Sequence, residues 1–190
     1  MGLKTRRLAE AGGRPAVFFD RDGCLNDDIG YLFDIAKFRW LPGAVEAVRL
    51  VNRSGALAFV VTNQSGIARG LYTPADVEAV HAWMSAELAK VGAWIDAYRF
   101  CPHHPTAGEG PFTRACDCRK PEPGMLLGLS NAWGVDPRRS FMVGDQPRDK
   151  AAAEAAGIAG YQVEPGGLLA AVRHGLHTHC FAPAPSPLSS

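Results

Sequence analysis

Two aspartates spaced one residue apart, Asp20 and Asp22, are the residues whose types and spacing most directly suggest chemistry. They follow the apolar run Val17–Phe19 and precede Gly23, a pattern that predicts a buried strand ending at the edge of a sheet. In open α/β sheets, ligands bind at this edge, beyond the carboxyl ends of the strands. Two carboxylates brought together there repel each other unless a cation such as Mg²⁺ lies between them. The segment is therefore a candidate site for phosphoryl transfer, although taken alone it also fits a turn with solvated carboxylates.

Further residues of possible functional importance follow the aspartate pair along the chain, each beside a predicted strand or helix. The residues concerned are Thr62 after the apolar run 57–61, Lys120 before Pro121, and Gly144, Asp145 and Asp149 after the apolar run 141–143. Together with the aspartate pair, they form an ordered set of a strand-end Asp-x-Asp, a strand-end Thr, a Lys and a strand-end Gly-Asp. This set resembles the four motifs of the haloacid dehalogenase (HAD) superfamily of phosphatases. The resemblance spans roughly residues 16–163, which is most of the chain.

The resemblance implies hydrolysis of a phosphate ester through an aspartyl-phosphate, with Mg²⁺ as a cofactor. It implies that Asp20 is the nucleophile, and that Asp22 first protonates the leaving oxygen and then accepts a proton from water. Thr62 and Lys120 are expected to bind the equatorial oxygens of the phosphate. The expected Mg²⁺ ligands are Asp20, Asp145 and the backbone carbonyl of Asp22, with Asp149 orienting Lys120 or a metal-bound water.

A second candidate site lies in a long loop that contains three cysteines and two histidines. Cys101 and His103 stand one residue apart, and Cys116 and Cys118 follow after twelve intervening residues. Three cysteines and one histidine form a standard closed zinc set, so we expect Zn²⁺ to hold this irregular loop in shape. His104 is the alternative histidine ligand, but His103 matches the one-residue spacing of the second pair. Free thiols or a disulfide are the alternatives to a metal, and a cytosolic enzyme rarely keeps disulfides.

Between the motifs, the sequence alternates between predicted strands and helices. Repeated β-α units predict a parallel sheet with right-handed crossovers, and the resemblance implies a three-layer, Rossmann-like core. The intervals between the motifs leave no room for a cap domain, so we expect an open site whose specificity comes from loops. The predicted strands are 17–19, 57–61, 95–100, 140–144 and 158–163, and the predicted helices are 43–55, 74–88, 123–134 and 151–156.

The candidate substrate contacts lie in the loop after the first motif, after the second strand, and beside the third and fourth motifs. They are Asp28, Gly30, Tyr31, Asn63, Gln64, Ser65, Arg119 and Gln146. With the zinc loop, these segments resemble a capless, zinc-containing group of HAD phosphatases. Its members act on heptose bisphosphate or on histidinol phosphate.

The length of the loop segment 106–115 favours the members of this group that act on heptose bisphosphate. The resemblance then implies removal of the 7-phosphate of D-glycero-D-manno-heptose 1,7-bisphosphate. Gln146 departs from the pattern, because those enzymes usually have lysine there, and one candidate contact to the uncleaved phosphate is lost. Arg119 remains, and Arg148 and Lys150 are nearby, but the sequence does not show where their side chains point. Histidinol phosphate, another small sugar phosphate, or a catalytically inactive HAD-like binding protein are the alternatives.

Length and composition are ordinary for a single domain. The 190 residues are 47% hydrophobic and carry a formal net charge of +1, which gives no general case for nucleic-acid or membrane partners. We recognise no secretory signal and no apolar stretch near the ~20 residues of a membrane span. We therefore expect a monomeric, cytoplasmic enzyme with a small phosphorylated sugar as substrate. Its core is expected at about residues 15–175, with a disordered Pro/Ala/Ser-rich tail over 181–190.

Overall fold

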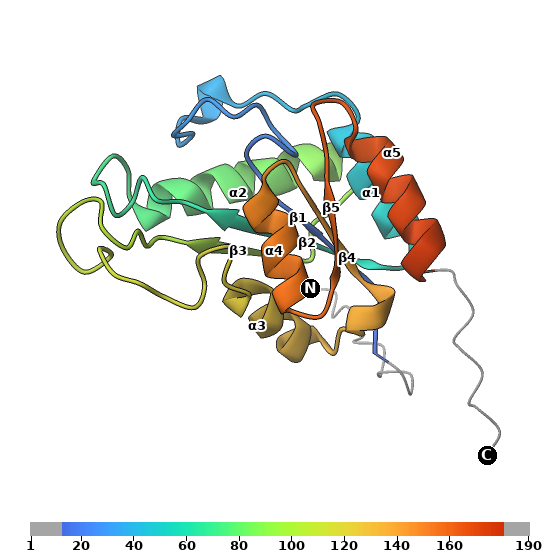
Figure 1. Cartoon of the computed structure of the whole chain (residues 1–190). Helices are drawn as coiled ribbons and strands as arrows, with labels where there is room; N and C mark the ends of the chain where they lie inside the picture. Colours follow the sequence, from blue (N-terminus) through green and yellow to red (C-terminus); the bar gives the residue numbers. More distant parts are fainter. Residues whose placement is uncertain (1–12, 181–190) are drawn as a thin grey trace, which may run out of the picture.

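Five strands form one parallel sheet in the order β3-β2-β1-β4-β5 (Figure 1). The structure is a computed structural model that describes residues 13–180, so the expected tail at 181–190 lies outside the described residues. The parallel sheet and its helical crossovers confirm the predicted α/β fold class. The strands are β1 (Ala16–Phe19), β2 (Leu57–Asn63), β3 (Ala97–Cys101), β4 (Phe141–Gly144) and β5 (Ala159–Gln162).

Helices cover both faces of the sheet and complete three layers (Figure 1). Residues of β1 alternate between two apolar cores: Val17 and Phe19 pack in one, and Ala16 and Phe18 in the other. Because the central strands are buried on both sides, they read as continuous apolar runs. The first core is covered by α1 (Ala44–Ser54), α2 (Pro74–Lys90) and α5 (Leu168–Gly175), and the second by α3 (Gly124–Trp133) and α4 (Pro147–Ala155).

Most helix ends follow the predicted capping signals, but α4 begins earlier than the predicted residue 151. Its first turn starts at Pro147, because Gln146 and Asp149 form a capping box that satisfies backbone N–H groups before the alanine run. α5 is not among the predicted elements. Short helical turns complete the described chain at η1 (Ile35–Lys37), η2 (Pro137–Arg139) and η3 (Leu176–Cys180).

Within residues 13–180, each connection between successive strands contains a single α-helix, with at most one short helical turn besides. β1 leads to β2 through one loop, η1 and α1, and β2 leads to β3 through α2. Within this described range there is no separate cap domain, as the spacing of the motifs predicted. In the same part of the chain, no helix is long and apolar enough to cross a membrane.

The sheet brings the carboxyl ends of its three central strands side by side. Phe19, at the end of β1, pairs with Val60 of β2 and with Val143 of β4. The backbone N–H of Asp20 donates to the carbonyl oxygen of Val143 at 2.9 Å, so the next residue stays close to β4. The residues that follow β1, β2 and β4 therefore meet at one edge of the sheet, which is where open α/β sheets bind ligands.

Candidate active site

Asp20 lies at the centre of this edge, one residue beyond β1. Its side chain is buried, and Oδ1 lies 2.8 Å from Nζ of Lys120 and accepts a hydrogen bond from the backbone N–H of Arg21 at 2.7 Å. Burial raises the pKa of Asp20 to about 7, although Lys120 acts in the opposite direction. The carboxylate is therefore poised to bind either a proton or a cation close to neutral pH.

Lys120 is a buried ammonium group held between two carboxylates. Its Nζ lies 2.8 Å from Asp20 and 2.7 Å from Oδ1 of Asp149, and it donates to the carbonyl oxygen of Val61 at 2.8 Å. Burial alone lowers the pKa of Lys120, but Asp20 and Asp149 outweigh burial and raise it above its usual value. Asn63 fixes the backbone of Lys120, because its side-chain amide exchanges two hydrogen bonds of 3.0 Å with the N–H and C=O of that residue.

Three carboxylates at this edge could hold a metal ion. Oxygen atoms of Asp20, Asp145 and Asp149 all lie within 4.8 Å of one another. Oδ1 of Asp145 is buried and has no hydrogen-bond partner within the described residues. Because a buried carboxylate oxygen without a partner is costly, this set of hard oxygen donors fits Mg²⁺ well.

Two glycines allow these carboxylates to come so close. A Cβ atom on Gly144 would lie 2.4 Å from Oδ2 of Asp149, and a Cβ atom on Gly23 would lie 2.5 Å from Oδ2 of Asp145. Gly23 also has a φ of +80°, which side chains rarely adopt. The glycine of each motif is therefore required by close packing against an acidic side chain.

The side chain of Asp22 points into a cluster of hydrogen-bond donors. The buried guanidinium of Arg21 donates to both of its oxygens, at 3.1 and 3.0 Å. Asn26 donates to Oδ1 at 2.9 Å, and Gln64 donates to Oδ2 at 2.9 Å. Four donated hydrogen bonds thus fix the orientation of this carboxylate, and its charge is paired with Arg21.

Gln64 supports the site and does not line the substrate cavity, contrary to its expected role as a substrate contact. Its side chain is 2% exposed, and Nε2 donates to Thr62 at 2.9 Å as well as to Asp22. Oε1 accepts a hydrogen bond of 2.7 Å from the hydroxyl of Tyr72. Because every polar atom of the side-chain amide is engaged inside the protein, Gln64 holds Asp22 and Thr62 in place.

A cavity of about 260 Å³ opens over Asp20 and gathers most of the predicted substrate contacts. These residues come from the loop after β1, from the end of β2 and from the segment before α3. Arg148, from the first turn of α4, also lines the cavity and was not among the predicted contacts. The lining residues are Asp20, Asp22, Asp28, Gly30, Tyr31, Thr62, Asn63, Ser65, Arg119 and Arg148.

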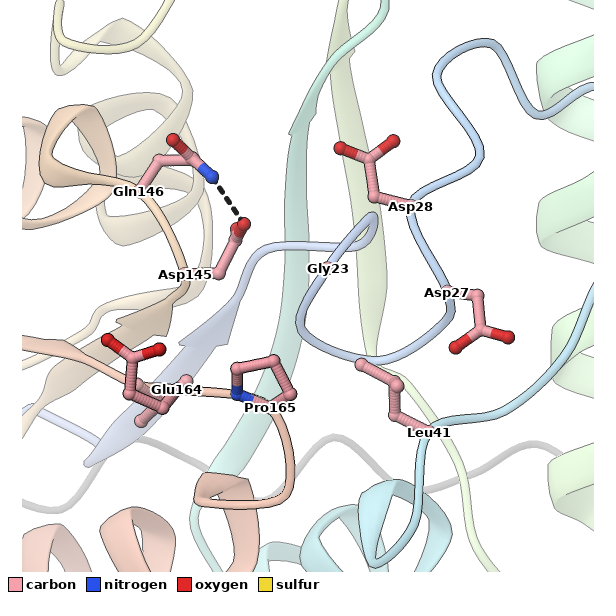
Figure 2. A pocket seen from close by; sticks show the side chains of 9 residues that line it. Gly23, Asp27, Asp28, Leu41, Asp145, Gln146, Glu164 and Pro165 are labelled. Carbon is pink, nitrogen blue, oxygen red and sulfur yellow. Dashed lines mark hydrogen bonds between the residues drawn. The ribbon is translucent and has the colours of Figure 1, made fainter.

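Gln146, which was also an expected substrate contact, does not line this cavity. Its Nε2 donates to Oδ2 of Asp145 at 2.5 Å, and Figure 2 shows the side chain turned toward that carboxylate. Together with Asp28 and Glu164, these two residues border a second pocket of about 440 Å³, which adjoins the substrate cavity at Asp28. The capping role of Gln146 at the start of α4 explains its position, since its backbone N–H donates to Asp149 at 3.0 Å.

The structure also brings the predicted zinc ligands together. The three sulfur atoms of Cys101, Cys116 and Cys118 lie 3.3 to 3.5 Å from one another. Nδ1 of His103 lies 3.6 Å from the sulfur of Cys101 and 3.4 Å from that of Cys118. His104 lies outside this group, and its Nδ1 instead accepts hydrogen bonds from two backbone N–H groups of the loop.

These distances fit a tetrahedral ion. Ligand atoms of a zinc site with ordinary bond lengths lie about 3.5–3.8 Å apart, close to the spacings of this cluster. Such a closed site leaves no position for substrate, so its effect would be on the shape of the loop. Nη1 of Arg119, which also borders the substrate cavity, donates to the carbonyl oxygen of His103 at 3.2 Å. The cluster thus contributes to the position of a cation in the cavity.

The chain matches known proteins over most of its length. A family model described as HAD-hydrolase-like matches residues 117–179. The D-glycero-beta-D-manno-heptose-1,7-bisphosphate 7-phosphatase of Rhodopseudomonas palustris is 47% identical over 156 residues, covering 82% of this chain and 87% of that protein. The chain belongs to the HAD family of phosphatases. The predicted family and enzyme class are therefore confirmed.

Other HAD phosphatases agree with this assignment. The Escherichia coli K12 protein of the same name is 44% identical over 144 residues, covering 76% of this chain and 75% of that protein. A D,D-heptose 1,7-bisphosphate phosphatase from B. bronchiseptica has been solved in complex with magnesium and phosphate. It matches this chain with a TM-score of 0.71 and 34% identity, and the match covers 90% of this chain and 89% of that chain. A HAD-like phosphatase from Mesorhizobium loti has a TM-score of 0.78 and 34% identity, with coverages of 88% and 90%.

The sequence did not single out Arg21 and Tyr72, and it left the direction of Arg148 open. Arg21 is completely buried beside Asp22, and its place between two aspartates of a buried motif was the only available signal. Tyr72 acts through Gln64, and Arg148 stands one residue before Asp149. Neither of these two carries a local pattern that would reveal the direction of its side chain.

We expect Tyr72→Phe to lower kcat about tenfold while KM changes little, because the lost hydrogen bond no longer fixes the amide of Gln64. Burial raises the pKa of Tyr72 to about 12, so its hydroxyl is a donor at neutral pH. Steady-state kinetics on one phosphate ester would measure the change. Tyr98→Phe is the matched control, since that hydroxyl contacts Ser85 instead. Equal kcat values for the two variants would contradict the expectation.

Mg²⁺ affinity should weaken as the pH falls below about 7. With its pKa raised to about 7, Asp20 of the metal-free protein carries a proton below that pH and loses it above. Binding at pH 6 must release this proton, so the affinity should be about fivefold lower at pH 6 than at pH 7. Calorimetric titration of the metal-free protein with Mg²⁺ at pH 6, 7 and 8 measures this. The same affinity at all three values would show that no such competition exists.

Purified protein should contain about one zinc ion per chain, held by the four clustered residues. Cys118→Ser should lose this zinc and make the loop before Lys120 accessible to protease, because the closed site is broken. Metal analysis and limited proteolysis would be compared with those of Cys180→Ser, which changes a cysteine outside the cluster. Equal zinc content and equal cleavage in the two variants would contradict the scaffold role.

Proposed function

We propose that this enzyme removes the 7-phosphate of D-glycero-β-D-manno-heptose 1,7-bisphosphate. The observation that carries the proposal is the buried group of Asp20, Lys120 and Asp149 beside Asp145, at the floor of a cavity bordered by two arginines. Relatives at 44–47% identity bear the name of this activity. A cytoplasmic location and a monomeric state are part of the same proposal.

In the first step, a carboxylate oxygen of Asp20 attacks the phosphorus atom in line with the sugar oxygen at C7. The bond between phosphorus and this oxygen breaks, and the oxygen receives a proton from Asp22. In the second step, water attacks the phosphorus of the aspartyl-phosphate and Asp22 takes up a proton from the water. The products are inorganic phosphate and the heptose 1-phosphate, and Asp20 is regenerated.

The remaining groups stabilise charge on the phosphoryl group. Thr62 and Lys120 contact its equatorial oxygens, where charge spreads in the transition state. Asp20 and Asp145 would hold Mg²⁺, with Asp149 adjoining, and the bound ion would offset the negative charge of nucleophile and phosphate. Lys120 pairs with both Asp20 and Asp149, so it also keeps the nucleophile oriented.

Asp22 is proposed to donate a proton in the first step and to accept one in the second. These two roles place different demands on the hydrogen bonds around it. As a carboxylate it accepts four hydrogen bonds from Arg21, Asn26 and Gln64, which hold it in a fixed orientation for the step in which water is activated. To act as an acid, it must carry a proton on one oxygen and give up a donor there. A protonated Asp22 turned toward the cavity, which it already lines, would meet this requirement.

The function can be tested by measuring phosphate release from a panel of heptose 1,7-bisphosphate, histidinol phosphate and fructose 1,6-bisphosphate. We expect the highest kcat/KM on the heptose bisphosphate and an absolute requirement for Mg²⁺. Asp20→Asn should reduce kcat by at least about 10³-fold, whereas Asp34→Asn, at the cap of η1, should not. A higher kcat/KM on histidinol phosphate would reject the substrate, and an active Asp20→Asn variant would reject the nucleophile.

A further inference from the structure

Two arginines from different parts of the fold line the cavity over Asp20. Arg119 follows the cysteine cluster, and Arg148 belongs to the first turn of α4. Asp20 and Asp22 pair with the buried cations Lys120 and Arg21, and Lys120 also pairs with Asp149. Within residues 13–180, neither cavity arginine forms an ion pair with these acids. The two arginines therefore supply positive charge that the catalytic acids do not consume.

The side chain of Arg148 is exposed and has no hydrogen bond or ion pair within residues 13–180. Its neighbours on α4 are engaged: Asp149 pairs with Lys120, and Lys150 lies 3.8 Å from Glu154. A guanidinium that borders a cavity without an internal partner is free to bind an anionic group of a ligand. Its planar donors suit two hydrogen bonds to one phosphate.

The side chain of Gln146 does not supply a positive charge to the substrate cavity. It is uncharged, it is bound to Asp145, and it faces the second pocket shown in Figure 2. The residue directly after Asp145 therefore brings no positive charge to the substrate cavity. Arg148, two positions farther along, is the one residue of the first turn of α4 that lines it.

We propose that Arg148, together with Arg119, binds the second phosphate of a bisphosphorylated substrate while the phosphate to be cleaved lies at Asp20. Arg148 is thereby a specificity-determining residue that makes the enzyme prefer bisphosphates over monophosphates. This inference rests on the proposed function, because it assigns the position of the phosphate that remains on the sugar. Arg119 is oriented by its hydrogen bond to the carbonyl oxygen of His103, so Arg148 is the adjustable member of the pair.

The test compares substrates that differ only in the second phosphate. kcat/KM is measured for heptose 1,7-bisphosphate and heptose 7-phosphate, and for fructose 1,6-bisphosphate and fructose 6-phosphate. Arg148→Gln should lower the preference for the bisphosphate of a pair about tenfold, mainly through KM, because a charge-assisted contact to phosphate is lost. Arg148→Lys, which keeps the charge but not the planar pair of donors, should retain part of the preference.

Lys150→Gln is the matched control, because it removes one positive charge from the same helix outside the cavity and should leave the preference unchanged. A preference for bisphosphate in the wild type that Arg148→Gln keeps would overturn the inference and leave the proposed function intact. No preference in the wild type for either bisphosphate would also overturn the inference, whereas the proposed function falls only if histidinol phosphate is the better substrate. General destabilisation would lower both members of a pair alike, so the ratio separates a binding role from a structural one.

Discussion

The site depends on one buried ammonium group between two buried carboxylates. Lys120 is 1% exposed and bridges Asp20 and Asp149, whose negative charges would otherwise repel each other in a medium poor in water. Burial of each charged group is unfavourable by itself, and their mutual contacts offset it. The removal of one partner would leave an unpaired buried charge, so the arrangement requires all three residues.

The surrounding structure serves to bring these groups together from distant parts of the chain. Asp20 directly follows β1 and Asp149 belongs to α4, whereas Lys120 reaches the site at the end of a long irregular segment. The amide of Asn63, at the end of β2, binds the backbone of Lys120 on both its N–H and its C=O. The cysteine cluster lies directly before this point: Cys101 ends β3, and its other three members lie in the segment between β3 and α3. A metal there would take the part that an apolar core takes elsewhere in a domain.

The same pairing of charges divides the site into two regions. The catalytic acids Asp20 and Asp22 form ion pairs with Lys120 and Arg21, which are both buried. The charges that face the open cavity are then mainly those of Arg119, Arg148 and Asp28. The reaction and the recognition of substrate thus use different residues. Because residues 13–180 contain no cap domain, loops and the start of α4 form the open side of the cavity.

The sequence by itself determined the fold class and the order of the motifs, because apolar periodicity and strand-end acids are local patterns, and the resemblance of those motifs to the HAD superfamily indicated the family. It also indicated the four clustered zinc-ligand candidates, since their spacing is local. Only the tertiary structure decided where the polar side chains point. Gln64 faces inward because Tyr72, Thr62 and Asp22 satisfy its amide, and Gln146 turns to Asp145. Arg148 borders the cavity because α4 begins at Pro147. Such directions depend on partners far away in sequence, which no local pattern contains.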